Sequence, residues 1–438
     1  MLSTLKQHKI KKLFKDPEKI PGSLALRRKF LEKITQPYYG RKLIDPDFFA
    51  FYDRSFFEDT REASRTVLAP NTVKIHRKEI DVLPLLDGKL AEVGIPKFYG
   101  GYWQKRKYFN TAELHENMAY GSSSAAAYFV GNGLFSNAVA LYGTQQQKWM
   151  WLPQIAKGRK IGCFGLTGND GGSNPAFARS LRYAKQGDNF ILNGSKSFIT
   201  NGPIANISLV FATGENNKIT AFIVPSKIEG RGTGFVAGKP EDYSGWRGSK
   251  TSDIFFDDVP VAPENVLGSV DHGLKIAFHA LFHMRTNIQA QMLGLIERAY
   301  DESLTYVRTR KFRDKPLIEI PGVKDKIMRM ASIIDELQEK IYSNAIAGED
   351  SDRVMVLDTK NDRFVSSVMS AGISRLKILA CERLNEVAKI ATGLQGAQAL
   401  QEEHSVVSVI RADASVYQIV AGSNDVLQEQ VKQNDRWW

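Results

Sequence analysis

Residues 164–202 combine glycines and hydroxyl side chains at a spacing that suits the binding of a flat, polar-edged ligand. One predicted strand ends in Leu166-Thr167, a glycine-rich turn follows, and a second strand contains Phe198-Ile199-Thr200. Glycines let a backbone approach a ring closely, and hydroxyls and free N–H groups hydrogen-bond to ring oxygens and nitrogens. We therefore expect the two strand ends to lie close together at a binding site. An ordinary β-meander with polar turns is the alternative that local chemistry leaves open.

The composition indicates a large protein without disulfides. The chain has 438 residues, of which 43% are hydrophobic, which is enough for two or three domains. Its two cysteines, Cys163 and Cys381, favour a reducing compartment, and we expect an intracellular, cytoplasmic location. No apolar run approaches the ~20 residues of a membrane helix, and the N-terminus lacks the apolar core of a secretory signal. No Cys/His spacing predicts a metal site.

Positive charge is concentrated at the N-terminus. The net charge is +11, and residues 1–45 carry twelve Lys or Arg against four Asp or Glu. This segment is either a solvated, partly ordered extension or a basic amphipathic helix in peripheral contact with a membrane. No nucleic-acid-binding motif accompanies the charge, so we expect no nucleic-acid partner. The excess of positive charge favours the binding of a phosphorylated small molecule.

Helical patterns occupy both ends of the chain, and alternating strand patterns occupy the middle. Apolar spacing predicts helices at residues 52–67, 79–93, 112–120, 123–142, 274–308 (interrupted at Gly294), 323–346 and 366–391. Alternation predicts strands at residues 189–192, 207–212, 219–224 and 253–261. The predicted units are a basic extension (1–45), a helical domain (46–161), a β domain (162–268) and a helical bundle (269–438).

Several motifs, in order, resemble the acyl-CoA dehydrogenase family. The Leu-Thr strand end, the Gly-Ser turn and the Phe-Ile-Thr-Asn-Gly strand are similar to the flavin-binding signature of that family. Gly143-Thr144 with Gln147-Lys148, and Arg247-Gly248-Ser249 before the closing strand, are similar to two further family turns. The resemblance covers roughly residues 110–430. It implies an α+β chain with an N-terminal helical domain, a middle β-barrel and a C-terminal four-helix bundle, FAD as cofactor, and a homodimer or homotetramer.

The resemblance also assigns contacts to the flavin ring, residue by residue. Phe164, Leu166 and Thr167 would contact the ring, Phe198 would cover one face, and Thr200 would approach N5. Each of these residues also has a plain structural reading as part of a strand.

Other positions would touch the rest of the cofactor and the substrate. Arg310 matches an arginine that reaches the FAD pyrophosphate of a partner subunit, and Arg313 replaces part of a Phe-Gly turn with a compensating positive charge. Gly396, Ser423 and Asp425 fall in turns that face FAD in the family. For the substrate, the resemblance implies that Ser173 faces the pantetheine arm and that Arg285 lies in the active site.

The family reaction needs a glutamate that this chain lacks. A carboxylate removes the α-proton of an acyl thioester while hydride leaves the β-carbon for the flavin. The two positions known to supply the glutamate hold Ala421 and Met284, neither of which accepts a proton. His283, which shares a predicted helix face with His279, is an alternative base, and a packed helix histidine is the competing reading.

Three functions follow from this combination. The first is dehydrogenation of an acyl-CoA or acyl-carrier-protein thioester, with a relocated base or one supplied by a catalytic paralogue in a heteromer. The second is an FAD-dependent oxygenase, which needs no α-proton base. The third is an inactive binding or assembly subunit that keeps the fold. The sequence leaves the electron acceptor open.

Overall fold

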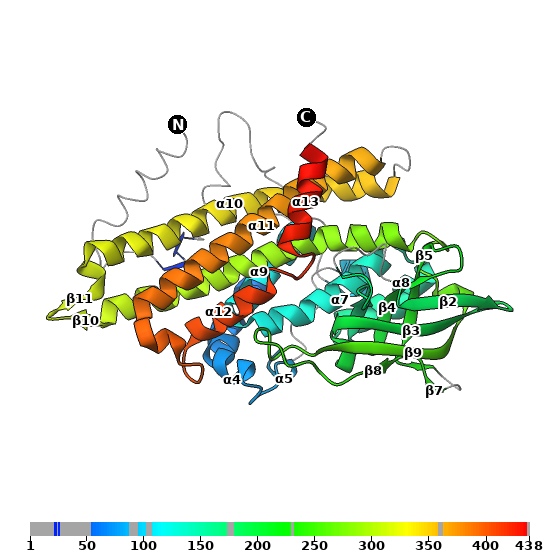
Figure 1. Cartoon of the computed structure of the whole chain (residues 1–438), viewed down its shortest axis with the longest axis horizontal. Helices are drawn as coiled ribbons and strands as arrows, with labels where there is room; N and C mark the ends of the chain where they lie inside the picture. The colour runs from blue at the N-terminus through cyan, green and yellow to red at the C-terminus, as the bar shows by residue number, and fades with distance from the viewer. Residues whose placement is uncertain are drawn as a thin grey trace.

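The computed structural model of the chain is largely helical, with one β region in the middle (Figure 1). It describes residues 22–23, 25–26, 54–86, 95–101, 107–172, 179–228, 232–357 and 362–435. Most of the predicted basic extension, 1–45, lies outside these residues. Ser23 is an exception, because its hydroxyl donates to the Asp301 carboxylate at 2.6 Å.

Among the described residues, six α-helices precede the β region: α3 (Arg54–Ala63), α4 (Thr72–His76), α5 (Leu83–Leu86), α6 (Lys107–Gly121), α7 (Ser123–Tyr142) and α8 (Gln145–Ala156). A side chain caps the start of α7, where the Ser122 hydroxyl accepts from Ala125 N. The prediction of a helix over 79–93 is wrong for 79–82. That stretch is irregular, α5 spans only four residues, and 87–94 lie outside the described residues. Pro84 suits only the first turn of a helix, since it has no N–H to donate.

The β region is a seven-stranded sheet with the order β1-β4-β2-β3-β9-β8, and β5 pairs with β4. Its strands are β1 (Gly162–Gly165), β2 (Leu181–Gln186), β3 (Asn189–Thr200), β4 (Ile207–Thr213), β5 (Ile219–Pro225), β8 (Val236–Ala237) and β9 (Thr251–Val261). β6 (Lys227–Ile228) and β7 (Gly232–Thr233) form a separate hairpin. The four strands predicted from alternation are confirmed, whereas the strand predicted to end in Leu166-Thr167 ends at Gly165. Every residue of β4 is buried, as expected for a strand covered on both faces.

In the described part of the chain after the sheet, the α-helices are α9 (Gly273–Thr309), α10 (Pro321–Leu357), α11 (Asp362–Gln395), α12 (Val406–Val416) and α13 (Asn424–Asp435). A small hairpin of β10 (Lys311–Phe312) and β11 (Lys315–Pro316) joins α9 to α10. The expected interruption at Gly294 is wrong, because α9 runs through it. A Cβ at Gly294 would collide with the Glu116 carbonyl oxygen and lie 3.0 Å from Tyr120 N, so the glycine lets α6 and α9 cross closely.

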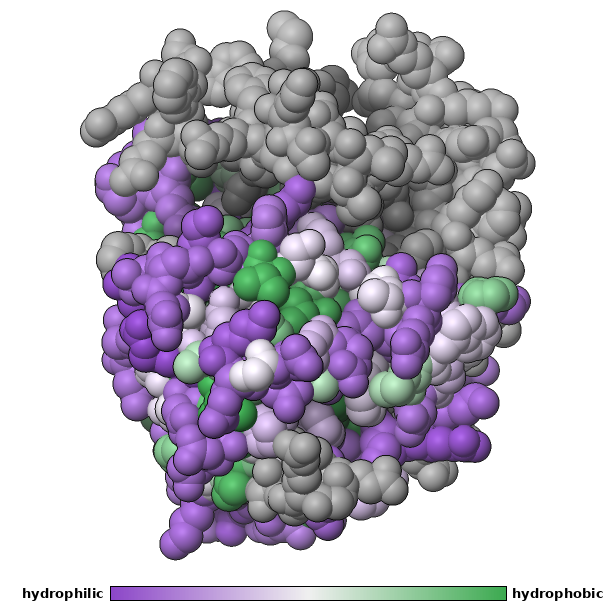
Figure 2. Space-filling view, turned by 90° about the vertical axis from the view of Figure 1, so that its right-hand side faces the viewer, coloured by the Kyte–Doolittle hydropathy of each residue, from purple (hydrophilic) through white to green (hydrophobic). Residues whose placement is uncertain are grey.

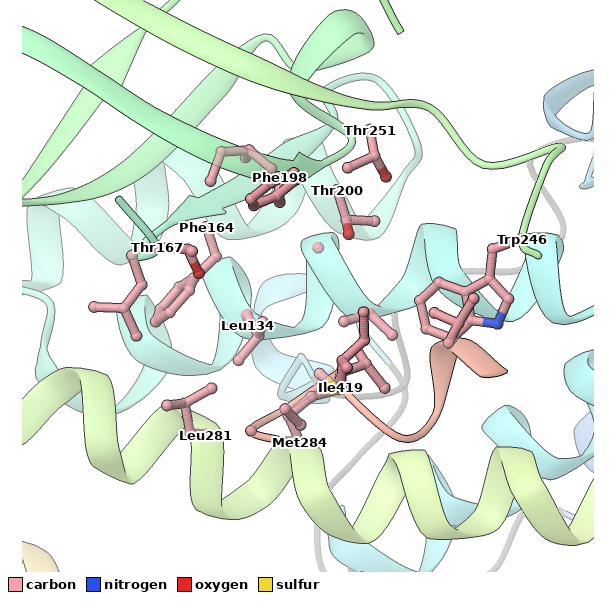
Figure 3. A pocket seen from close by; sticks show the side chains of 18 of the residues that line it. Leu134, Phe164, Thr167, Phe198, Thr200, Trp246, Thr251, Leu281, Met284 and Ile419 are labelled. Atoms are coloured by element: carbon pink, nitrogen blue, oxygen red, sulfur yellow. The ribbon is translucent and has the colours of Figure 1, made fainter. Parts of the chain in front are cut away.

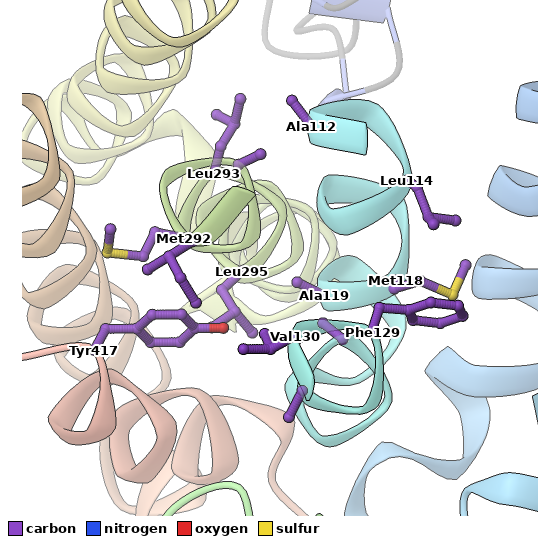
Figure 4. Close-up of a cluster of buried hydrophobic side chains, with 14 of the residues drawn as sticks. Ala112, Leu114, Met118, Ala119, Phe129, Val130, Met292, Leu293, Leu295 and Tyr417 are labelled. Atoms are coloured by element: carbon purple, nitrogen blue, oxygen red, sulfur yellow. The ribbon is translucent and has the colours of Figure 1, made fainter. Parts of the chain in front are cut away.

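The core that joins the two helical regions lies between α6, α7 and α9 (Figure 4). Apolar side chains such as Phe129 and Leu293 fill it. A short polar chain is buried within it: Gln291 Nε2 donates to His115 Nδ1 at 2.7 Å, and the Tyr417 hydroxyl donates to Gln291 Oε1 at 3.2 Å. Burial lowers the pKa of His115 to about 3. The core therefore holds this histidine neutral.

The end of the molecule that carries the sheet presents a mainly hydrophilic face with a small central group of hydrophobic side chains (Figure 2). None of the helices in the described ranges is both long and apolar enough to cross a bilayer. Within those same ranges, no three His, Cys, Asp or Glu side chains gather as metal ligands.

Candidate functional site

A cavity of about 500 Å³ lies where the sheet meets α7, α9 and the loop that follows α12 (Figure 3). Its volume falls within the range of about 300–1,000 Å³ that is usual for small-molecule sites. In Figure 3 the strand residues Phe198 and Thr200 lie on one side of the space, and Leu281 and Met284 of α9 lie on the other. Trp246 closes one end.

The sheet side of the cavity consists of the two strand ends that the sequence singled out. Ser197 N donates to Thr167 O at 2.9 Å, and the buried Lys196 ammonium donates to Leu166 O at 3.1 Å. The predicted proximity of these strand ends is therefore confirmed. Burial lowers the pKa of Lys196 to about 8. The five residues assigned to the flavin ring all line the cavity: Phe164, Leu166, Thr167, Phe198 and Thr200.

Phe198 has a backbone conformation that aromatic residues rarely adopt. Its φ is +60°, and its side chain is 60% exposed at the edge of the cavity. Phe198 N donates to the Asp253 carboxylate at 3.3 Å, which helps to hold this conformation. A strained residue with an exposed ring at a cavity is a feature of functional sites.

The helical side of the cavity contains Met284 and Ala421, the two positions that the resemblance assigned to the catalytic glutamate. Met284 projects from α9, and Ala421 lies in the loop between α12 and α13. Arg285 also lines the cavity, and burial lowers its pKa to about 10. Among the described lining residues, Arg285 is the only one with a side chain that is charged at neutral pH, and none carries a carboxylate.

Two buried cations hold the loop that carries Ala421. Arg285 Nε donates to Ala421 O at 3.1 Å. Lys377 Nζ donates to Gly422 O at 2.9 Å and to Asn424 Oδ1 at 2.7 Å. Lys377 is fully buried, and desolvation lowers its pKa to about 8. Sequence reasoning missed Lys377, although a lysine among the apolar positions of a long helix was an available signal.

The turn of residues 243–249, which includes Trp246, is fixed by the buried carboxylate of Asp413. Trp246 N donates to Asp413 Oδ1 at 2.7 Å, and the Ser123 hydroxyl donates to the other oxygen. Gly248 N donates to Ser124 Oγ at 3.1 Å. Burial raises the pKa of Asp413 to about 6. No local sequence pattern pointed to Asp413, because its partners lie far away along the chain.

Several candidate residues lie outside the cavity lining. His283 stacks on Tyr108, with ring centres 4.1 Å apart, and hydrogen-bonds to its hydroxyl, so it is not placed to act as a base in the cavity. Arg310 and Arg313 lie by the β10–β11 hairpin, at the opposite end of the molecule from the sheet (Figure 1).

The remaining FAD candidates are not brought to the cavity lining either. Gly396 begins the turn after α11, whereas Ser423 and Asp425 adjoin the 421 loop without lining the cavity. Ser173 lies outside the described residues.

Family models match three consecutive parts of the chain: the acyl-CoA dehydrogenase N-terminal domain at residues 53–159, the middle domain at 163–259 and the C-terminal domain at 271–434. A 3-(aryl)acrylate reductase of Clostridium sporogenes is 30% identical, over 79% of this chain and 88% of the relative. A short-chain specific acyl-CoA dehydrogenase of Megasphaera elsdenii is 29% identical, over 85% and 95%.

Solved structures agree with these matches. Butyryl-CoA dehydrogenase from Megasphaera elsdenii superposes with a TM-score of 0.74 at 27% identity, covering 87% of this chain and 97% of that one. A chain from work on the electron transferring flavoprotein of Acidaminococcus fermentans gives a TM-score of 0.77 at 26% identity, covering 87% and 96%. The predicted α+β fold with two helical domains around a β domain is confirmed.

Proposed function

The chain belongs to the acyl-CoA dehydrogenase family, and on this basis we propose that it binds FAD and catalyses flavin-dependent α,β-dehydrogenation of an acyl thioester. One observation carries the proposal: the five residues assigned to the flavin ring converge on a single cavity, with Met284 and Ala421 in its lining. The family membership of relatives that act on acyl-CoA supports the substrate class.

The cavity suits a flat ring system with polar edges. Its walls are mostly apolar, and the hydroxyls of Thr167, Thr200 and Thr251 are set among them. Apolar walls with a few placed polar groups are typical of cofactor sites. Phe198 lies at the edge, where its exposed ring would cover one face. When bound, FAD supplies the acceptor for the hydride that leaves the β-carbon.

The residues that line the cavity would then orient the flavin ring and the acyl thioester and exclude water from them. Thr167 and Thr200 would hold the polar edge of the ring, while Leu134, Leu281 and Met284 would pack against the acyl portion. Removal of the α-proton needs a base within about 3 Å of it. Because no described lining residue carries a carboxylate, we propose that the base comes from outside this lining, within the chain or from a partner chain.

The proposal is tested by spectroscopy of the purified protein. We expect a flavin absorbance band, or its appearance after loading with FAD, and anaerobic bleaching of that band on mixing with acyl-CoA thioesters such as butyryl-CoA. Thr200→Val, which removes one hydroxyl from the cavity, is expected to weaken FAD binding. Thr213→Val is the matched control, since Thr213 is buried in β4 away from the cavity. A chain that cannot be loaded with flavin would instead be an assembly subunit.

A second candidate function is flavin-dependent oxygenation. The lack of a carboxylate in the described lining favours it, because reaction of reduced flavin with oxygen needs no α-proton base. The two functions differ in their source of electrons. Bleaching by an acyl-CoA alone supports dehydrogenation, whereas bleaching only with NAD(P)H or a flavin reductase supports oxygenation.

We also propose a homo-oligomer, or a heteromer with a catalytic paralogue. Arg310 and Arg313 adjoin the β10–β11 hairpin, at the end of the molecule opposite the sheet, and do not line the cavity of their own chain; a neighbouring subunit would bring them to another cavity. Light scattering should give at least twice the monomer mass of 49.0 kDa. If the arginines reach a partner's FAD, Arg310→Ala should weaken FAD binding, whereas Arg182→Ala, on an exposed part of β2, should not.

A further inference from the structure

We propose that Lys196 is a positioning residue of the cofactor site, whose buried ammonium polarises the peptide group between Leu166 and Thr167 and thereby stabilises the reduced form of the bound flavin. The inference rests on the proposed function, since FAD is taken as the molecule that fills the cavity. It goes beyond that function by naming a residue of this chain that sets the reduction potential. The resemblance assigned no role to Lys196.

Lys196 lies behind the sheet side of the cavity. It belongs to β3, has no exposed surface and does not line the cavity. Its ammonium donates to Leu166 O at 3.1 Å, and its stem passes Gly165, where a Cβ would lie 3.5 Å from Lys196 Cγ. Leu166 and Thr167 both line the cavity. A fixed positive charge is therefore in contact with a peptide group of the cavity wall.

The geometry of this peptide group directs its N–H to the other side. The bond between Leu166 and Thr167 is trans, so the N–H of Thr167 points away from the carbonyl that Lys196 holds. Because that carbonyl points to a buried side chain behind the wall, the N–H points toward the cavity. Thr167 N donates to no acceptor among the described residues, whereas Thr167 O accepts from Ser197 N at 2.9 Å. The N–H is thus left for a molecule in the cavity.

The chemistry of the flavin ring indicates which of its groups this N–H would meet. The carbonyl acceptors lie in the pyrimidine half of the ring, and the dimethylbenzene half has none. Hydride transfer to N5 adds two electrons and one proton, so the product is an anion whose negative charge spreads over N1 and the adjacent carbonyl. A donor at that carbonyl binds the reduced ring more strongly than the oxidised ring.

The charge of Lys196 strengthens this preference. Burial lowers the pKa of Lys196 to about 8, and the carboxylate of Asp170 opposes the shift in part, so the ammonium stays protonated at neutral pH. A cation on the carbonyl oxygen polarises the amide and makes its N–H a better donor. The charge also acts directly on the ring, because the protein interior screens it less than water does.

The test compares three substitutions of Lys196 with one control. Lys196→Met removes the charge, Lys196→Gln keeps a hydrogen-bond donor without the charge, and Lys196→Arg keeps the charge. Lys185→Met removes a charge at an exposed position of β2 and is the control. The midpoint potential of bound FAD and the Kd for oxidised FAD are measured for each protein. Linkage then gives the affinity for reduced FAD, since a shift in potential equals the ratio of the changes in the two affinities.

We expect the equilibrium constant for reduction of bound FAD to fall about 10-fold in Lys196→Met and Lys196→Gln. This change lowers the midpoint potential by about 30 mV for a two-electron couple. Lys196→Arg and Lys185→Met should keep potentials near that of the wild type. The affinity for oxidised FAD should change less than the affinity for reduced FAD, because the oxidised ring carries no net negative charge for the cation to stabilise.

Two results would overturn the role of Lys196 while leaving the proposed function intact. The first is a wild-type potential in both uncharged variants, with equal or no loss of affinity for the two forms of FAD, which would mark a residue that only shapes the wall. The second is complete loss of FAD binding by both, since that effect is not selective for the reduced ring. A wild-type chain that cannot be loaded with FAD would instead reject the proposed function itself.

Discussion

Residue 421 lies in a loop whose backbone is held by two buried cations. Ala421 has a φ of +58° and Gly422 a φ of +102°, conformations that residues with a Cβ rarely adopt. Arg285 and Lys377 hold the two carbonyl groups, so the path of the loop does not depend on a large side chain at position 421. Because Ala421 lines the cavity, a longer side chain there would project toward a bound ligand.

Restoring a carboxylate at this position should therefore increase dehydrogenation. A well-placed general base typically contributes about 10²- to 10⁴-fold to a rate. We expect Ala421→Glu, and to a similar degree Met284→Glu, to bleach bound flavin faster with an acyl-CoA under anaerobic stopped-flow conditions. Ala421→Gln is the control, since it matches the size of glutamate without its proton affinity. No gain from either glutamate would argue against acyl thioesters as substrates.

At the scale of elements, the close crossing of α6 and α9 depends on one glycine. Gly294 has no room for a Cβ, because the backbone of Glu116 and Tyr120 fills that space. Gly393, in α11, has no atom within 4 Å of the position that a Cβ would take. Alanine substitutions at these two glycines should therefore change the stability of the protein in opposite directions.

We expect Gly294→Ala to lower the free energy of unfolding by about 1–3 kcal/mol or more, since the helices must move apart. Gly393→Ala should instead raise it by about 0.5–1 kcal/mol, because alanine favours a helix. Urea denaturation of both variants measures the difference. Equal effects of the two substitutions would show that the α6–α9 crossing is less tight than described.

Lys377 links α11 to the loop that carries Ala421. Its ammonium donates to acceptors at Gly422 and Asn424, and a methionine of similar length would make neither bond. We expect Lys377→Met to speed amide hydrogen exchange in residues 418–424 and to weaken acyl-CoA binding. Lys389→Met, at an exposed position of the same helix, serves as the control. Unchanged exchange in the loop would mean that other contacts suffice to order it.

The sequence could predict features that depend on neighbouring residues, but not those that depend on contacts between residues far apart along the chain. The strands at 189–192, 207–212 and 219–224 could be predicted because local alternation and turn residues specify them. Gly294 was misread because a helix-breaking residue and a close helix crossing give the same sequence signal. Asp413 was missed, since its role arises from partners that only the folded chain brings to it.

At the scale of the whole molecule, buried titratable groups couple stability to pH. His115 has a pKa of about 3 in the folded chain, against an ordinary value of 6.5. Between these values the unfolded chain binds more protons, so stability falls as the pH decreases from about 6.5 toward 3. Asp413 has the opposite effect on stability. Its folded-state pKa is raised to about 6, so between about pH 6 and 4 its protonation stabilises the folded chain as the pH decreases.

We therefore expect His115→Gln to flatten the acid side of the stability profile. The difference in slope should approach about 1.4 kcal/mol per pH unit, the value for one proton. Urea unfolding at several pH values from 7.5 to 4, with Asp413 unchanged in both proteins, measures it. Parallel profiles for the two proteins would indicate that His115 is protonated in the folded core.

The walls of the cavity come from stretches that are distant along the chain, namely residues 130–134, 164–172, 198–200, 243–251, 278–285 and 415–422. The cavity is therefore complete only when nearly the entire polypeptide has assembled, and a molecule bound there has no comparable affinity for partly folded forms. At a concentration 100 times its Kd, such a molecule adds about 2.7 kcal/mol to the folded state. We expect the yield of this protein during biosynthesis to depend on the supply of the ligand that binds in the cavity.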